Sequence, residues 1–162
     1  MMELKDLRDV PFARIKVRAL VRCDDKYIFI QRQKYGKRRK FLVFPGGRLK
    51  KSDRLYDDKK NISQTLENGL RRELEEELCA KDVVIEKLIA VGNKHEHDIE
   101  VLYLVSISSF DWENRTGKEF SNPHKGTYKL VSILTLNKET LGKNGFNLKP
   151  KKWRKLICSL MT

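Results

Sequence analysis

The sequence has few cysteines, and their spacing is not that of a cross-linked or zinc-bound fold. Cys23, Cys79 and Cys158 lie far apart, with no C-x-x-C pair and no histidine at zinc-finger spacing. Disulfide frameworks and structural zinc sites both use closely spaced cysteines. The sequence therefore predicts neither, and free cysteines suit a reducing cytoplasm.

Long apolar runs, internal repeats and low-complexity linkers are also absent. No stretch approaches the roughly 18 consecutive apolar residues that indicate a membrane-spanning helix. The opening segment, MMELKDLRDVPF, carries charges throughout, whereas a secretion signal has an apolar core. These absences predict a cytoplasmic protein without membrane contact, and the length suits a single domain at residues 1–162.

Acidic residues are outnumbered by basic ones. The chain has 35 Lys and Arg residues against 22 Asp and Glu residues, for a formal net charge of +13. A positive surface favours polyanionic partners such as nucleotides or nucleic acid. A small-molecule nucleotide is the expected partner. The basic stretch KYGKRRK at residues 34–40 leaves an RNA 5′ end open as an alternative.

Apolar and alternating segments predict a mixed or antiparallel sheet. Strands are expected at residues 14–23, 27–30, 82–91, 98–108 and 126–134. A short apolar run at residues 41–44 precedes Pro45, Gly46 and Gly47. Since two consecutive glycines permit a tight backbone turn, this segment is expected to form a loop that belongs to the functional site.

Two helices are expected. The first spans about residues 62–79, where Asn61 or Ser63 can cap its start. It follows a polar segment at residues 50–60 that is expected to be an exposed excursion. The second spans about residues 149–160, with Pro150 in its first turn and four apolar residues at helical spacing: Trp153, Leu156, Ile157 and Leu160.

The first helix places acidic residues beside its apolar face. Four leucines recur along this face: Leu66, Leu70, Leu74 and Leu78. At about 100° per residue, Glu73 and Glu77 lie within roughly 20° of the stripe and Glu76 flanks them. Like charges on neighbouring turns destabilise a helix unless a cation offsets them.

Two interpretations of this acidic cluster compete. In the simpler one, the segment LRRELEEEL is a solvated charged face in which Arg72 and Glu76 form an ion pair. The leucine register favours the other interpretation. Carboxylates beside an apolar face need compensation, and a hard divalent cation such as Mg²⁺ supplies it where phosphates are also bound.

Three segments resemble the Nudix hydrolase superfamily. The sequence RELEEE at residues 72–77 is similar to the R-E-U-x-E-E core of the Nudix box, where U is a bulky aliphatic residue. FPGG at residues 44–47 resembles the glycine loop of the family, and YIFIQR at residues 27–32 resembles its phosphate-contacting strand. The resemblance covers most of the chain. It implies an α/β fold, a Nudix-type α/β/α sandwich with a mixed central sheet.

The sequence departs from the family pattern in three ways. More residues separate Gly47 from Arg72 than the pattern allows. The first glutamate of the box is replaced, by Gln64 when counted back from Arg72 or by Asp53 when counted forward from Gly47. Cys79 occupies the position of the final glycine, where a strained or altered turn is expected.

The resemblance implies a catalytic metal site. Glu73 and Glu77 would bind Mg²⁺ directly, Glu76 would contribute to the cluster, and the carbonyl of Gly46 would be a backbone ligand. Mn²⁺ is an alternative metal. By the same resemblance, Arg72 would orient the carboxylates through charge-assisted hydrogen bonds.

Further residues are expected from the loops and the second strand. Glu119, in the sequence TGKEF, is a candidate for an additional metal-binding carboxylate, with Glu96 and Glu100 as rivals. Either Glu73 or a loop glutamate would accept the proton of the attacking water. Arg32 is the candidate for a substrate-phosphate contact, beside the glycines Gly46 and Gly47.

The expected function is that of a Mg²⁺-dependent hydrolase cleaving the pyrophosphate bond of a nucleoside diphosphate linked to another moiety, acting as a monomer or homodimer. The linked moiety could be a nucleotide, a sugar, ribose or a similar group. One alternative is a non-catalytic Nudix-fold module that binds a nucleotide or RNA. Another is an unrelated basic α/β nucleic-acid-binding protein, for which the FPGG segment and the carboxylate register would be coincidental.

Overall fold

The computed structural model describes residues 2–54, 61–93, 98–116, 127–132 and 147–161. Its strands are β1 (Ile15–Cys23), β2 (Lys26–Gln33), β3 (Lys40–Val43), β4 (Gly46–Arg48), β5 (Val84–Asn93), β6 (Ile99–Ile107), β7 (Thr127–Ser132) and β8 (Leu148–Lys149). Its helices are α1 (Ile62–Leu78), α3 (Lys152–Met161) and the short 3-10 helices η1 (Leu4–Leu7), η2 (Phe12–Arg14) and η3 (Lys51–Asp53).

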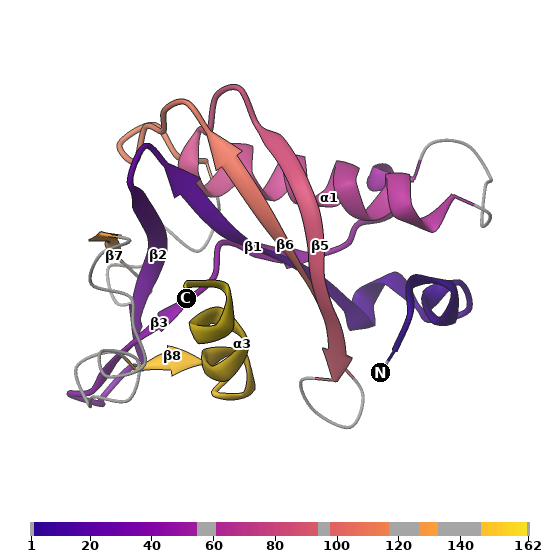
Figure 1. The fold of residues 1–162 in the computed structure, drawn as a ribbon, viewed down its shortest axis with the longest axis horizontal. Helices are drawn as coiled ribbons and strands as arrows, with labels where there is room; N and C mark the ends of the chain where they lie inside the picture. Colours follow the sequence, from indigo (N-terminus) through magenta and orange to yellow (C-terminus); the bar gives the residue numbers. More distant parts are fainter. Residues whose placement is uncertain (1, 55–60, 94–97, 117–126, 133–146, 162) are drawn as a thin grey trace.

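The strands form one mixed sheet in the order β5-β6-β1-β2-β3-β8 (Figure 1). β4 pairs with β1 and β7 pairs with β2, beside this path. The pairs β1/β6 and β3/β8 are parallel, and the other pairs are antiparallel. The expectation of a mixed sheet is confirmed.

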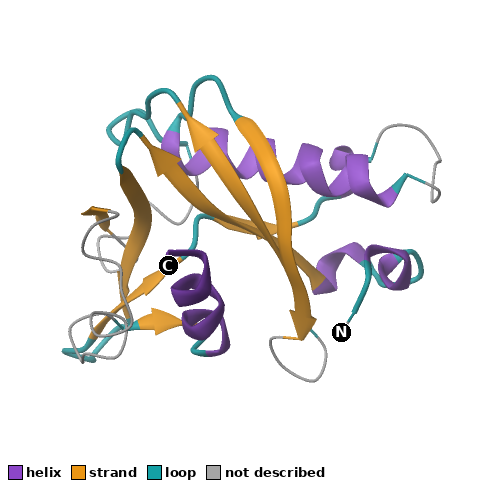
Figure 2. Ribbon diagram, viewed as in Figure 1, coloured by secondary structure: helices purple, strands orange, loops and turns teal. Residues whose placement is uncertain are grey.

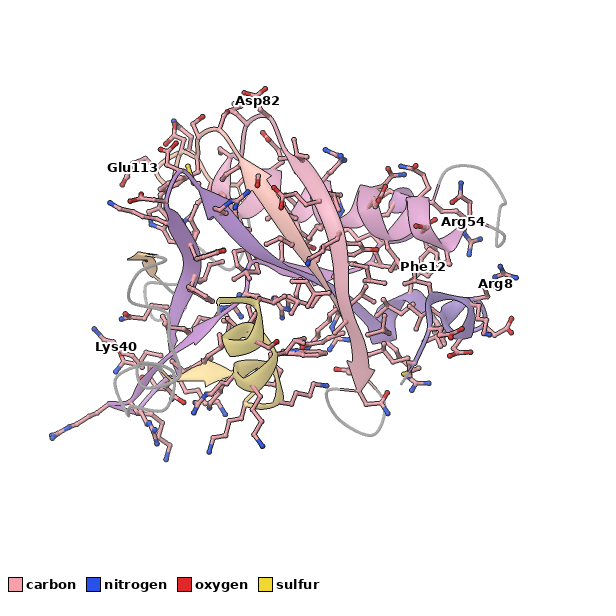
Figure 3. The ribbon with its side chains drawn as sticks, viewed as in Figure 1. Arg8, Phe12, Lys40, Arg54, Asp82 and Glu113 are labelled. Atoms are coloured by element: carbon pink, nitrogen blue, oxygen red, sulfur yellow. The ribbon has the colours of Figure 1, made fainter. Side chains whose placement is uncertain are left out.

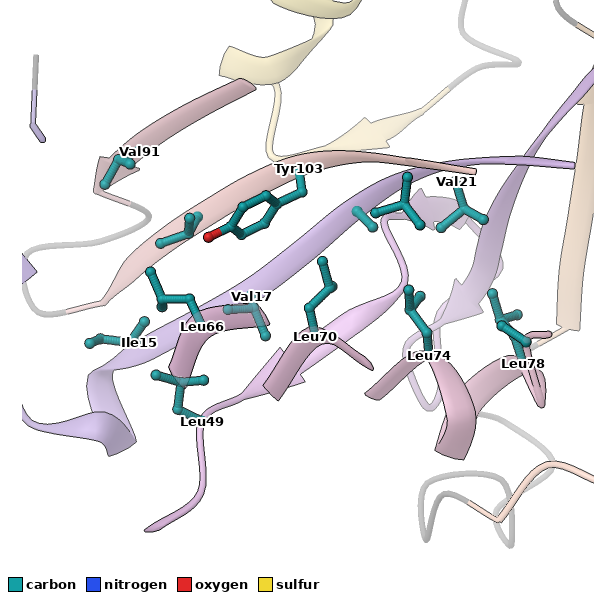
Figure 4. Close-up of a cluster of buried hydrophobic side chains, with 14 of the residues drawn as sticks. Ile15, Val17, Val21, Leu49, Leu66, Leu70, Leu74, Leu78, Val91 and Tyr103 are labelled. Carbon is teal, nitrogen blue, oxygen red and sulfur yellow. The ribbon is translucent and has the colours of Figure 1, made fainter. Parts of the chain in front are cut away.

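Helix α1 covers one face of the sheet through its leucine stripe. The side chain of Asn61 caps the helix by accepting a hydrogen bond from the backbone N–H of Gln64 at 3.1 Å. The four leucines of the stripe are fully buried against residues of β1, β5 and β6 (Figure 4). Because the leucine face of the helix packs on the sheet, the adjacent side chains of Glu73 and Glu77 are buried as well.

Helix α3 covers the opposite face, which completes the expected α/β/α sandwich (Figure 2). Trp153 and Ile157 are buried in a second apolar cluster, together with residues of β2, β3, β6 and β8. The helix begins at Lys152, later than the expected start at residue 149. Pro150 precedes it, and its carbonyl accepts a hydrogen bond from the N–H of Trp153 at 3.2 Å.

Two further local expectations were wrong. Gly46 and Gly47 were expected in a loop, but they begin β4 and pair with Arg18 and Val17 of β1. Residues 50–60 were expected to be an exposed excursion; Lys50, Lys51 and Ser52 are exposed, but the expectation was wrong for Asp53, which ends η3 and is 4% exposed, and residues 55–60 lie outside the described residues. No helix within the described ranges is long and apolar enough to cross a membrane.

Candidate metal and phosphate site

The pairing of β4 with β1 brings the glycine segment close to α1. Gly46 has a φ of 134°, and a Cβ there would overlap with the carbonyl oxygen of Val17. A Cβ on Gly47 would lie 2.6 Å from the carboxyl carbon of Glu73. Both positions therefore require glycine, one for backbone conformation and the other for the approach of a carboxylate.

Glu77 is buried beneath this segment. Glu77 is 1% exposed, and its Oε2 accepts a hydrogen bond from the N–H of Gly46 at 3.0 Å. Burial raises the pKa of Glu77 to about 8, although Arg18 and the Gly46 N–H oppose this shift. A carboxyl group held in such a place binds a proton or a cation at neutral pH.

Glu73 and Glu76 are held by a single arginine. Nη1 of Arg72 donates to Oε1 of Glu73 at 2.9 Å and to Oε2 of Glu76 at 3.2 Å. Lys50 also contacts Oε1 of Glu76 at 3.4 Å. The Arg72–Glu76 ion pair of the simpler, solvated-face interpretation is present. The orienting role that the resemblance implies for Arg72 stays a prediction, and these hydrogen bonds are the contacts it would use.

Arg72 is itself fixed by Asp53. Its Nε and Nη2 donate to the two carboxylate oxygens of Asp53 at 2.8 and 3.0 Å, a bidentate pair. Burial opposes the charge of Arg72, but the hydrogen bonds to Asp53 and Glu73 outweigh it and raise its pKa. Of the two registers left open by the sequence, the forward count from Gly47 therefore identifies the acidic partner. The extra residues enter after Asp53.

Gln64, the other candidate for the first position of the box, lies elsewhere. Its side-chain amide donates to Oδ1 of Asn68 at 2.8 Å, within the first turns of α1. Asn68 in turn donates to the backbone carbonyl of Asp53 at 3.1 Å. Gln64 thus supports the helix start and the η3 segment, as its helix-capping position suggests.

The three glutamates line one cleft of about 510 Å³. Five basic side chains also line this cleft: Lys16, Arg18, Arg32, Arg48 and Lys50. Within the described residues, Nε of Arg32 is buried without a hydrogen-bond partner. A cleft lined by both carboxylates and guanidinium groups suits a metal–phosphate complex.

Arg18 belongs to the cleft although its sequence context did not predict it. This side chain is 9% exposed, and its Nη1 donates to the carbonyl of Gly46 at 2.7 Å and to that of Phe44 at 3.2 Å. Its Nε lies 3.7 Å from Oε1 of Glu100. The one signal in the sequence was that Arg18 is a charged residue between the apolar residues Val17 and Ala19 of the first expected strand.

The donors fit a hard divalent cation in kind but not in their present arrangement. Glu73 and Glu77 are buried oxygen donors, and a Gly46 carbonyl has a second lone pair beyond the one used by Arg18. Among the residues that the structure describes, however, no three acidic, histidine or cysteine side chains are arranged to hold a metal ion. The glutamates are instead engaged by protein donors, which a cation would have to displace.

The predicted loop carboxylate Glu119 lies outside the described residues, as does its rival Glu96. The N–H of Thr116 donates to the carbonyl of Glu76 at 2.8 Å, and Thr116 lines the cleft. The other rival, Glu100, is 1% exposed and accepts a hydrogen bond from Nε1 of Trp153 at 3.2 Å. Glu100 faces a neighbouring cavity, apart from the three glutamates.

Cys79 ends α1 in a left-handed conformation, as expected for a strained turn. Its φ of 47° and ψ of 42° are left-handed, so a non-glycine residue ends α1 in the conformation that glycine adopts most readily. Its Sγ lies 3.0 Å from the carbonyl of Asn114. Burial, followed by Glu75 and Asp111, raises the pKa of the thiol. This environment favours a packing role over a reactive thiolate.

We expect Gly47→Ala to lower metal-dependent activity at least tenfold, because the new methyl group would displace the Glu73 carboxylate. Activity and Mg²⁺-induced thermal stabilisation should be measured in parallel. Gly92→Ala is a suitable control, since its Cβ would meet its nearest heavy atom at 3.2 Å, outside the cleft. Equal activity of Gly47→Ala and the parent would contradict the assigned role of Glu73.

Solved structures of known proteins share this architecture. No family model matches the sequence, and no curated protein does either. An ADP-ribose pyrophosphatase from Streptococcus suis is 15% identical, with 91% of each chain covered and a TM-score of 0.55. A NUDIX-family hydrolase from Clostridium perfringens is 16% identical, with 92% of this chain and 98% of that chain covered and a TM-score of 0.55. A NUDIX hydrolase from Nitrosomonas europaea is 18% identical, with 91% and 88% covered and a TM-score of 0.55. At these identities the likeness establishes the fold: the chain has the α/β/α fold of the Nudix hydrolases.

Proposed function

We propose that this chain is a Nudix-type pyrophosphohydrolase that uses Mg²⁺, with Mn²⁺ as an alternative, to cleave a nucleoside diphosphate linked to another moiety. The observation that carries the proposal is the burial of two carboxylates, Glu73 and Glu77, at a cleft that basic side chains also line. Burying a carboxylate costs free energy even where it is partnered, as Glu73 is by Arg72 and Glu77 by the Gly46 N–H. Their retention is explained by a cation that binds together with a phosphate substrate.

The carboxylates of Glu73, Glu76 and Glu77 would hold the metal, with the Gly46 carbonyl and Glu119 as further ligands. A divalent cation in such a site neutralises charge on phosphate oxygens and lowers the pKa of a bound water. The protein positions these ligands, because Arg72 holds the carboxylates of Glu73 and Glu76 through hydrogen bonds.

Arg32 is the residue that we assign to the substrate. Its guanidinium lines the cleft and lies close enough to Glu77 to lower the pKa of that group. The unpartnered Nε can donate to a phosphate oxygen. Either Glu73 or Glu119 accepts the proton of the attacking water in this proposal.

The second candidate is a non-catalytic module with the same fold that binds a nucleotide. The raised pKa of Glu77 weighs against it. A binding module has no need for a buried carboxyl group at this cost, because an amide of similar shape would form the same hydrogen bond with Gly46. The two candidates differ in turnover, which makes them separable by experiment.

The proposal is tested by a screen for phosphate or nucleotide release. A panel of nucleoside diphosphate derivatives is incubated with the protein and Mg²⁺, beside Glu77→Gln and the matched control Glu75→Gln, whose carboxylate is exposed on the same helix. We expect turnover of at least one compound, a loss of about 100-fold or more in Glu77→Gln, and parental activity in Glu75→Gln. The enzyme proposal is wrong if no compound turns over or if Glu77→Gln is as active as the parent.

A further inference from the structure

A second cavity of about 460 Å³ adjoins the cleft. It lies by β3, β8 and the start of α3, and it shares two wall residues, Arg18 and Arg32, with the cleft of the glutamates. The two hollows are therefore neighbours along one surface. A substrate whose phosphates occupy the cleft can extend its next group into this second cavity.

The second cavity is strongly basic. Beyond the two shared arginines, its wall contains Lys34, Lys149 and Lys151, and none of these lysines forms an ion pair within the described part of the chain. Nitrogen-tipped side chains surround β3, β8 and the start of α3, near the labelled Lys40 (Figure 3). Lysines gathered around one cavity without acidic partners attract an anion.

The single carboxylate in this wall does not offset the lysines. Glu100 is 1% exposed, and its Oε2 already accepts the indole N–H of Trp153. Its Oε1 lies 3.7 Å from Nε of Arg18, so the carboxylate mainly offsets the charge of that arginine. The positive charge of the three lysines is therefore available to attract an anionic ligand.

The aromatic side of the cavity is also positively charged. Nζ of Lys149 lies 4.5 Å from the centre of the Phe41 ring, a cation–π arrangement. A ring covered by an ammonium group is a poor platform for stacking a nucleobase. The first turn of α3 adds the positive end of a helix dipole beside Pro150 and Lys151.

We propose that this basic cavity binds a phosphate group beyond the cleaved pyrophosphate, so that the substrate carries at least one further phosphate instead of an uncharged sugar or base at that end. The proposal rests on the proposed function for the identity of the cleaved bond. The anion-binding property of the cavity itself does not require catalysis or metal.

The test measures binding of inorganic tripolyphosphate and pyrophosphate to the full chain by calorimetry, with EDTA present so that no metal contributes. The key variant is Lys34→Gln/Lys149→Gln. The matched control is Lys26→Gln/Lys87→Gln, which removes the same charge from exposed positions outside the cavity. We expect tripolyphosphate to bind the parent more tightly than pyrophosphate does, and to lose about five- to tenfold in affinity in the key variant only.

Equal losses in the two double variants would overturn the proposal, because net charge alone would then explain the binding. An unchanged affinity in the key variant, or no preference for the longer phosphate, would overturn it as well. The Glu77→Gln protein separates this inference from the proposed function. It should keep its lysine-dependent tripolyphosphate binding even if no compound is ever hydrolysed.

Discussion

Asp53→Asn should lower the free energy of unfolding by about 2 kcal/mol, because Arg72 loses its bidentate carboxylate partner and keeps only Glu73 and Glu76 as anionic partners. The two hydrogen bonds between these side chains are 2.8 and 3.0 Å long, and Asp53 is 4% exposed. An amide can accept only one of them and carries no charge. Urea unfolding followed by tryptophan fluorescence measures the loss.

The matched control for this prediction is Asp98→Asn. Asp98 also pairs with arginine, through Arg48 at 3.3 Å, but the arginine side chain is 51% exposed. Solvent screens such a pair, so the control should lose no more than about 1 kcal/mol. Equal losses in the two variants would show that Asp53 has no special role.

Asp53→Asn should also reduce activity when its fold is intact. Arg72 contacts Glu73 and Glu76 through the same guanidinium that Asp53 fixes, so the substitution frees the arginine to move. Asp53→Glu restores the charge and should recover part of both stability and activity. A variant that is destabilised but fully active at low temperature would contradict this coupling.

Glu77→Gln is expected to stabilise the metal-free protein at pH 9, by roughly 3 kcal/mol relative to the parent. Burial raises the pKa of Glu77 to about 8 in the folded chain, above its ordinary value. Between the ordinary and the folded pKa, only the folded state holds the proton. The stability of the parent therefore falls as pH rises through this window, by at most about 1.4 kcal/mol per pH unit, and levels off above the folded pKa.

Unfolding curves at several pH values in EDTA measure this difference. The gap between Glu77→Gln and the parent should widen from about pH 5 to pH 8, whereas Glu75→Gln should follow the parent within about 0.5 kcal/mol. Adding Mg²⁺ near pH 9 should stabilise the parent more than Glu77→Gln, because ligand binding favours the folded state and the carboxylate is needed to bind. A parallel pH dependence of Glu77→Gln and the parent would contradict the buried position of this carboxyl group.

The predicted and observed sites differ in instructive places. The cleft gathers Glu73, Glu76, Glu77 and Arg32, all of which the sequence predicted to act together. From the sequence, Asp53 was a candidate only as a count from Gly47, and no partner was predicted for Arg18. Contacts of this kind join residues far apart in the chain, and a single sequence does not state which strand pairs with which.

The sequence by itself determined α1 and its acidic face. A helix repeats every 3.6 residues, so the leucines and the glutamates beside them are placed by local periodicity alone. Only the tertiary structure decided the rest. Pairing of β4 with β1 turned an expected glycine loop into a strand, and the packing of η3 against α1 selected Asp53 as the partner of Arg72. Such pairings depend on which distant segments share a buried face, and local spacing does not encode them.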